Sequence, residues 1–126
     1  MGNIIKEVGK DIKHVMQATR FSFDGLVACF RRERAFRLDC ILGVVHVLAA
    51  IIVPATLLET VVLVIVWLFL LAGELANSAI EEVVDAVSPQ WSPWAKRAKD
   101  YGSAVVFMAL VALGVCWCYV LVRRWA

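Results

Sequence analysis

Three long apolar segments follow one another through the second two thirds of the chain. The first runs from Cys40 to Leu58 and the third from Ala104 to Val122, each close to the roughly 20 helical residues that cross a bilayer core. The second begins at Val61, and its helical pattern continues through polar residues to Val87. We therefore expect three transmembrane helices, over residues 38–58, 59–87 and 102–123.

The first 32 residues have a different pattern, with apolar residues recurring at helical spacing on one face and basic or polar residues on the other. The apolar face holds Ile5, Val8, Ile12, Val15, Met16, Thr19, Phe23, Leu26, Val27 and Phe30, and the polar face Lys6, Lys10, Lys13, His14, Gln17 and Asp24. This pattern predicts an amphipathic helix over residues 1–32 that lies in the membrane interface. The alternative is a helix that binds a partner protein.

Composition agrees with a membrane protein, because 62% of the 126 residues are hydrophobic. The length allows a single domain, residues 1–126, and a net charge of +2 is too small to indicate a nucleic-acid partner. The four cysteines have no zinc-ligand spacing. The first residues are amphipathic rather than a compact apolar core, so we expect no signal peptide.

Basic residues are concentrated before the first span and in the loop after the second, which holds Lys96, Arg97 and Lys99. The turn between the first two spans, from Pro54 to Thr60, has none. The positive-inside rule then predicts a multi-pass membrane protein with its N-terminus and the loop after its second span in the cytoplasm. Arg123 and Arg124, on the far side, depart mildly from this rule.

Polar residues form one stripe on the second predicted span, in the run "GELANSAIEEVVD". Glu74, Asn77, Ser78, Glu81 and Asp85 share one helical face, whereas Glu82 points away from it. Hydrogen bonding between helices explains Asn77 and Ser78 well. It explains Glu74 and Glu81 poorly, because a buried carboxylate costs several kcal/mol unless it is paired or neutralised. We therefore favour a functional role for these two acids.

Further charged residues are expected near the same cytoplasmic interface. Glu33 precedes the first span, and Lys99 and Asp100 precede the third. The acids could hold a divalent cation, and hard oxygen ligands favour magnesium over zinc. A metal, a positive charge and a base together are what phosphoryl transfer requires. On spacing alone, Lys99 and Asp100 could equally be a solvated loop pair.

Three motifs resemble those of the prokaryotic diacylglycerol kinase family, small integral membrane kinases that include undecaprenol kinases. They are E-x-x-N-S/T-A-I-E-x-x-V-D at Glu74–Asp85, A-K-D-x-G-S at Ala98–Ser103 and E-x-A-F-R at Glu33–Arg37. The resemblance covers nearly the whole chain. It implies an all-α membrane protein, with an N-terminal amphipathic interfacial helix plus three transmembrane helices in a homotrimeric bundle. It also implies composite sites between subunits that use ATP and Mg²⁺.

The resemblance implies a role for each matching residue. Glu74 corresponds to the general base that takes the proton of the lipid hydroxyl, and Glu33 and Glu81 to the acids that bind the metal. Asn77 corresponds to an amide that orients the base or the substrate. The remaining matches are to nucleotide contacts, at Lys99, Asp100 and Ser22, and to a lipid contact, at Ser103. Ser22 could equally be a solvated surface serine.

The expected activity is transfer of the ATP γ-phosphate to diacylglycerol, which gives phosphatidic acid. No Walker A or protein-kinase glycine motif is present, so side chains and metal must bind the phosphates. Phe21, His14 and Leu38 depart from residues of some family members, which leaves undecaprenol as an alternative acceptor. A small proton or ion pathway built on Glu74 and Glu81 is a second alternative. A structural scaffold is a third.

Overall fold

The computed structural model describes residues 2–54 and 56–126 and contains four helices within them. They are α1 (Gly2–Arg32), α2 (Arg34–Ile52), α3 (Leu57–Val87) and α4 (Pro93–Trp125). The side chains of residues 2–6 and 8 lie outside the description, and with them the apolar positions Ile5 and Val8 and the basic Lys6 of the predicted amphipathic face.

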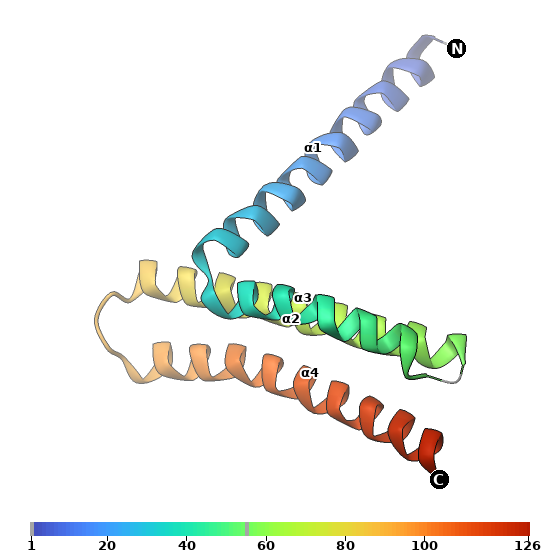
Figure 1. Ribbon diagram of the computed structural model, residues 1–126. Helices are drawn as coiled ribbons and strands as arrows, with labels where there is room; N and C mark the ends of the chain where they lie inside the picture. Colours follow the sequence, from blue (N-terminus) through green and yellow to red (C-terminus); the bar gives the residue numbers. More distant parts are fainter. Residues whose placement is uncertain (1, 55) are drawn as a thin grey trace.

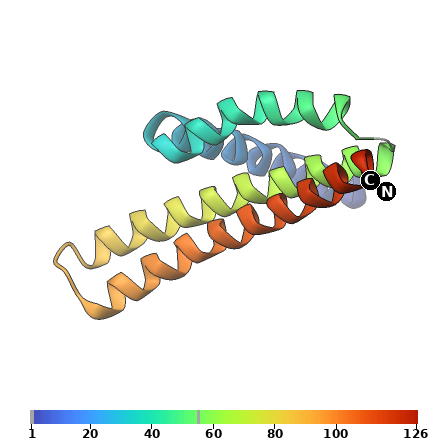
Figure 2. The ribbon, with the colours of Figure 1, turned by 60° about the horizontal axis from the view of Figure 1, so that its bottom comes forward.

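Helices α2, α3 and α4 form a bundle in which α3 lies between the other two and packs against both (Figure 2). Each of the three is long and apolar enough to cross a membrane. The prediction of an all-α protein with three membrane-spanning helices is therefore confirmed for the described residues. Homotrimer formation and an interfacial position for α1 stay predictions.

Helix α1 leaves the bundle at a steep angle and points its N-terminus away from it (Figure 1). The turn after it is a single residue, Glu33, with extended backbone (φ −93°, ψ 121°). The junction between α1 and α2 and the turn between α3 and α4 lie at the same end of the bundle (Figures 1 and 2). This arrangement brings basic residues of both segments to one end, as the sequence predicts.

Local sequence explains where the spans begin and end. Helix α2 ends at Ile52, earlier than expected from the apolar run, because Pro54 has no amide hydrogen with which to continue the helical hydrogen bonds. Helix α3 begins with a capping box, in which Thr56 and Glu59 each accept a hydrogen bond from the other's backbone amide. Helix α4 begins at Pro93, well before residue 102, since Ser92 caps it and proline is favoured at the first helical position.

A polar contact ties the three spanning helices together in the middle of the bundle. The Trp117 indole of α4 donates to Nδ1 of His46 on α2, at 3.3 Å. The other ring nitrogen of His46 lies 3.1 Å from the Leu63 carbonyl of α3. Because Nδ1 accepts, Nε2 carries the hydrogen and donates to that carbonyl. Deeper toward the α2–α3 turn, Ala50, Leu63 and Val120 form the buried core.

Candidate functional site

The acidic stripe of α3 lies at the end of the bundle near the α1–α2 junction. Glu74 is almost fully buried, with 8% of its surface exposed, and Asn77, Ser78 and Glu81 are half-buried. The Asn77 amide Nδ2 donates to Oε1 of Glu81 at 3.0 Å. Asp85, one turn further along, is exposed. The stripe therefore runs from a buried acid to an exposed one.

Helix α4 packs closely against the Asn77 amide. A methyl group at Gly102 would overlap the Asn77 carbonyl oxygen, so only glycine leaves room for this amide against α4. That oxygen is buried and has no hydrogen-bond partner among the described residues. Turning the amide over would point the oxygen at the Glu81 carboxylate, which has no hydrogen to donate when ionised. Glu81 thus sets which way the Asn77 amide faces, and Gly102 leaves room for the amide against α4.

A groove of about 570 Å³ opens between the end of α1 and the outer face of α3. Its lining includes Cys29, Glu33, Ser78, Glu81, Glu82 and Asp85. Two of the residues that the sequence assigns to the metal, Glu33 and Glu81, therefore face the same cavity. Glu82 points away from the acidic stripe in the sequence-based expectation, but it also lines this groove. It pairs with Arg32 at 3.1 Å, because the end of α1 lies on that side of α3.

Asp39 is a site residue that the sequence analysis missed. It lies in the second turn of α2, and its carboxyl group lies beside that of Glu74. Among the described residues Glu74 thus has an acid beside it and makes no ion pair. A signal was present in the sequence, since Asp39 is an acidic residue at the very start of the first apolar segment.

Cys29 packs into the inner wall of the groove, where 8% of its surface is exposed. Its thiol lies 3.8 Å from the Ser78 hydroxyl. Burial raises the pKa of the Cys29 thiol above its ordinary value, and the nearby carboxylates of Glu33 and Glu74 raise it further, although the Ser78 contact acts in the opposite direction. We therefore expect this thiol to be a poor nucleophile, and its burial reports how tightly α1 packs on α3.

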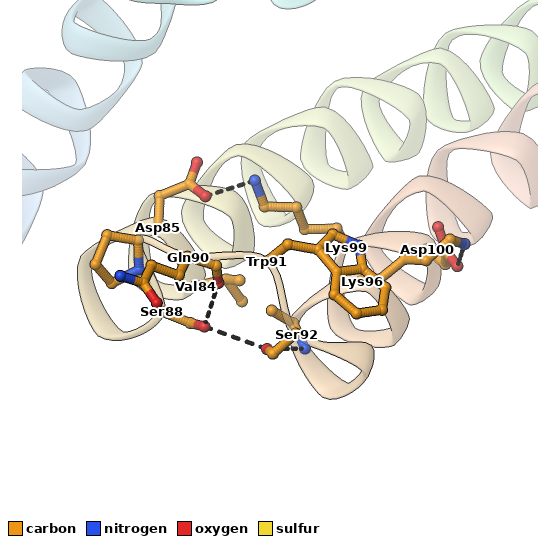
Figure 3. A pocket seen from close by; sticks show the side chains of 11 residues that line it. Val84, Asp85, Ser88, Gln90, Trp91, Ser92, Lys96, Lys99 and Asp100 are labelled. Carbon is orange, nitrogen blue, oxygen red and sulfur yellow. Dashed lines mark hydrogen bonds and ion pairs between the residues drawn. The ribbon is translucent and has the colours of Figure 1, made fainter.

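A second cavity, of about 340 Å³, lies at the α3–α4 turn (Figure 3). Lys99 reaches across it from α4, and its Nζ lies 2.6 Å from Oδ1 of Asp85. Asp100 instead pairs with Lys96, also at 2.6 Å, on the other side of the cavity. Asp85 lines this cavity as well as the groove, so the two cavities are neighbours joined at the Lys99–Asp85 ion pair.

Two predicted contact residues lie apart from these cavities. Ser22 is exposed on α1, where its hydroxyl donates to the Ala18 carbonyl at 3.0 Å. Ser103 is exposed on α4, next to Gly102. Glu33, Glu74, Asn77 and Glu81 therefore lie near one another at this end of the bundle, and Lys99 is connected to them through its ion pair with Asp85. Ser22 and Ser103 lie apart from this group. The functional roles of all these residues stay predictions.

The arrangement of the acids suits a magnesium ion that is also held by nucleotide phosphates. It is less suited to a metal ion held by protein side chains alone. Among the described residues no three His, Cys, Asp or Glu side chains gather closely enough to hold a metal. Magnesium, however, is commonly bound by one or two carboxylates together with substrate phosphates. Glu33 and Glu81, from different helices but facing one groove, meet that requirement.

Fold and site together define a small integral membrane protein with three spans and an acidic, lysine-flanked site at one end. Comparison with known proteins gives the class a name: the chain belongs to the prokaryotic diacylglycerol kinase family, whose model matches residues 20–121.

Curated relatives share most of their length with this chain. It is 41% identical over 110 residues to the diacylglycerol kinase of Pseudomonas aeruginosa, covering 87% of this chain and 89% of that protein. Identity to the Haemophilus influenzae diacylglycerol kinase is 36% over 106 residues, covering 84% and 90%. Identity to the Escherichia coli K12 diacylglycerol kinase is 32% over 107 residues, covering 85% and 88%.

Proposed function

We propose that this protein is an ATP-dependent diacylglycerol kinase that produces phosphatidic acid at the membrane surface. Family membership supports the activity, and the observation that carries the assignment of the site is the convergence of Glu33 and Glu81 on the groove beside the buried Glu74. The metal would be Mg²⁺, held by Glu33 and Glu81 and by the nucleotide phosphates. When bound, it neutralises charge on the transferring phosphoryl group.

The chain's own residues do the rest. The oxygen of the lipid hydroxyl attacks the γ-phosphorus while Glu74 accepts the proton of that hydroxyl. The bond from the γ-phosphorus to the β–γ bridging oxygen breaks and releases ADP. Asn77 holds Glu81 through its amide. Lys99 exchanges Asp85 for phosphate oxygens when the nucleotide binds. Asp100 and Ser22 contact the nucleotide, and Ser103 the lipid.

We further propose that the kinase works in the bacterial inner membrane with α1 and the α3–α4 turn in the cytoplasm. The basic residues at that end of the bundle support this orientation. Ser22 and Ser103 line neither of the two cavities described above, which supports a site completed by a neighbouring subunit in a homotrimer. Helix α1, with exposed apolar residues such as Phe23 and Val15, would lie in the interface.

The test is phosphate transfer from labelled ATP in mixed micelles, with diacylglycerol and undecaprenol as separate acceptors, each with and without Mg²⁺. We expect Mg²⁺-dependent labelling of diacylglycerol. Labelling of undecaprenol alone would make the protein an undecaprenol kinase of the same family. Labelling of neither lipid by a folded protein would contradict the kinase assignment and direct the next experiment to proton flux in liposomes.

A further inference from the structure

The junction between α1 and α2 is held by an arginine that the motif contains but that no role above explains. Arg37 is half-buried in the first turns of α2. One nitrogen of its guanidinium, Nη1, donates to the carbonyl oxygens of Phe30 at 3.1 Å and of Arg31 at 3.0 Å. Both carbonyls belong to the last turn of α1, where helix geometry leaves carbonyl groups without an intrahelical partner.

The same arginine is tied to Glu33 through the backbone. The Arg37 amide donates to the Glu33 carbonyl at 3.2 Å, and the Glu33 amide donates to the Cys29 carbonyl at 2.7 Å. Glu33 is therefore connected to α1 on one side and to α2 on the other. Its side chain makes no capping hydrogen bond, so it is left to face the groove.

Few other polar contacts hold α1 in place. The Arg32–Glu82 pair joins α1 to α3, but both side chains are about three-quarters exposed, and exposed ion pairs contribute little. With only one residue between the helices, the angle of α1 decides where the Glu33 carboxylate points. A contact that fixes that angle also fixes the acid.

We propose that Arg37 is a positioning residue: by binding the C-terminal carbonyls of α1 it sets the angle of the α1–α2 junction and so places Glu33 opposite Glu81. Arg37 acts through Glu33 and does not touch the reacting atoms. The structural half of the proposal, that Arg37 sets the angle of the junction, does not depend on the proposed function. The catalytic half, that Arg37 thereby places Glu33 for Mg²⁺ binding, rests on the proposed function. Each half is tested by its own measurement.

The structural half is tested by alkylation of Cys29, which is buried where α1 packs on α3. The full-length protein is prepared with Cys40, Cys116 and Cys118 replaced by Ala and is reacted with a maleimide in the absence of ligands. In this background we expect Arg37→Ala to label about tenfold faster than the parent, equivalent to about 1.4 kcal/mol in the opening equilibrium. Arg37→Lys, which keeps a donor at this point, should recover much of the protection.

Arg34→Ala is the matched control, because Arg34 is exposed in the neighbouring turn and takes part in no ion pair within the described residues. It should label at the parental rate. Equal labelling of the Arg37→Ala and parent proteins would overturn the proposal whether or not the protein is a kinase. Circular dichroism of each variant separates loosening of the junction from general unfolding.

The catalytic half is tested by the Mg²⁺ dependence of lipid phosphorylation. Loss of an outer contact that orients a metal ligand typically weakens metal affinity about 10–100-fold. We expect Arg37→Ala to raise the half-saturating Mg²⁺ concentration by about tenfold, with kcat at saturating Mg²⁺ little changed. Faster Cys29 labelling with unchanged Mg²⁺ dependence would overturn the proposed route through Glu33. If the parent phosphorylates no lipid, the proposed function fails, and labelling alone decides the role of Arg37 at the junction.

Discussion

Replacing Gly102 by alanine tests how closely α3 packs against α4. An added methyl would overlap the Asn77 carbonyl oxygen and would also lie tightly against the Ile80 side chain. Gly114, three turns further along the same helix, has nothing within 4 Å of an added methyl. The pair Gly102→Ala and Gly114→Ala therefore makes the same chemical change in two environments.

The two variants should gain the same stability from helix propensity but differ in the cost of overpacking. Alanine is favoured over glycine in a helix interior by about 0.5–1 kcal/mol, and both variants gain this. Only Gly102→Ala is overpacked, which typically costs about 1–3 kcal/mol. The difference between their free energies of unfolding should therefore be about 1–3 kcal/mol. Reversible unfolding by SDS in mixed micelles, followed by circular dichroism, measures it.

Activity should fall together with stability at Gly102. Moving Asn77 away from α4 weakens its hydrogen bond to Glu81, and hydrogen bonds to charged groups contribute about 1.5–3 kcal/mol. We therefore expect kcat/KM for lipid phosphorylation to fall at least about tenfold in Gly102→Ala and to stay near the parental value in Gly114→Ala.

A double-mutant cycle identifies the cause. In an Asn77→Ala background the carbonyl is gone, so the cost of Gly102→Ala should shrink, and the two substitutions should couple. If Gly102→Ala is as stable as Gly114→Ala, or if the cycle is additive, then the Asn77 carbonyl does not pack against Gly102 in the way described.

Three further perturbations test other parts of the structure. Glu74→Gln should keep nucleotide binding but lower kcat by about 10²–10⁴-fold, because an amide cannot accept the hydroxyl proton; near-normal turnover would remove Glu74 as the base. Cys29 should be alkylated by a maleimide several-fold more slowly than a cysteine placed at exposed Ala28, tested as Ala28→Cys in a Cys29→Ala background. The alkylation rate of Cys29 should keep rising at pH values where that of an ordinary thiol has levelled off, because its raised pKa moves thiolate formation to higher pH. Equal rates and equal pH profiles would contradict the described burial. Trp117→Phe should lower the free energy of unfolding by about 0.6–1.7 kcal/mol by leaving Nδ1 of His46 unpaired, an effect that the same change at exposed Trp125 should not produce.

The spans and the acidic stripe follow from the sequence because both depend on local periodicity. Glu74, Asn77 and Glu81 are three or four residues apart, so any helix over this run places them on one face. Ser92 and Pro93 form a standard helix beginning and so indicate the start of α4, whereas hydrophobicity alone predicts a start near residue 102.

Contacts between helices could not be predicted in the same way. The position of Asp39 beside Glu74, and the choice of Asp85 rather than Asp100 as the partner of Lys99, depend on how far one helix is rotated against another. Glu82 lines the groove because the C-terminal end of α1 lies beside α3. Periodicity within a helix carries no information on how that helix lies against another.

The surroundings of Glu74 favour chemistry over a structural role for the stripe. A carboxylate retained in a membrane helix for stability is expected to have a cation against it, because an unpaired buried charge is expensive. Within the described part of the chain Glu74 makes no ion pair, and the side chain beside it, Asp39, is another acid. An acid held among acids, without a counter-ion of its own, gains a favourable partner when a proton or a cation-bearing substrate arrives, and that is the situation of a group that takes part in a reaction.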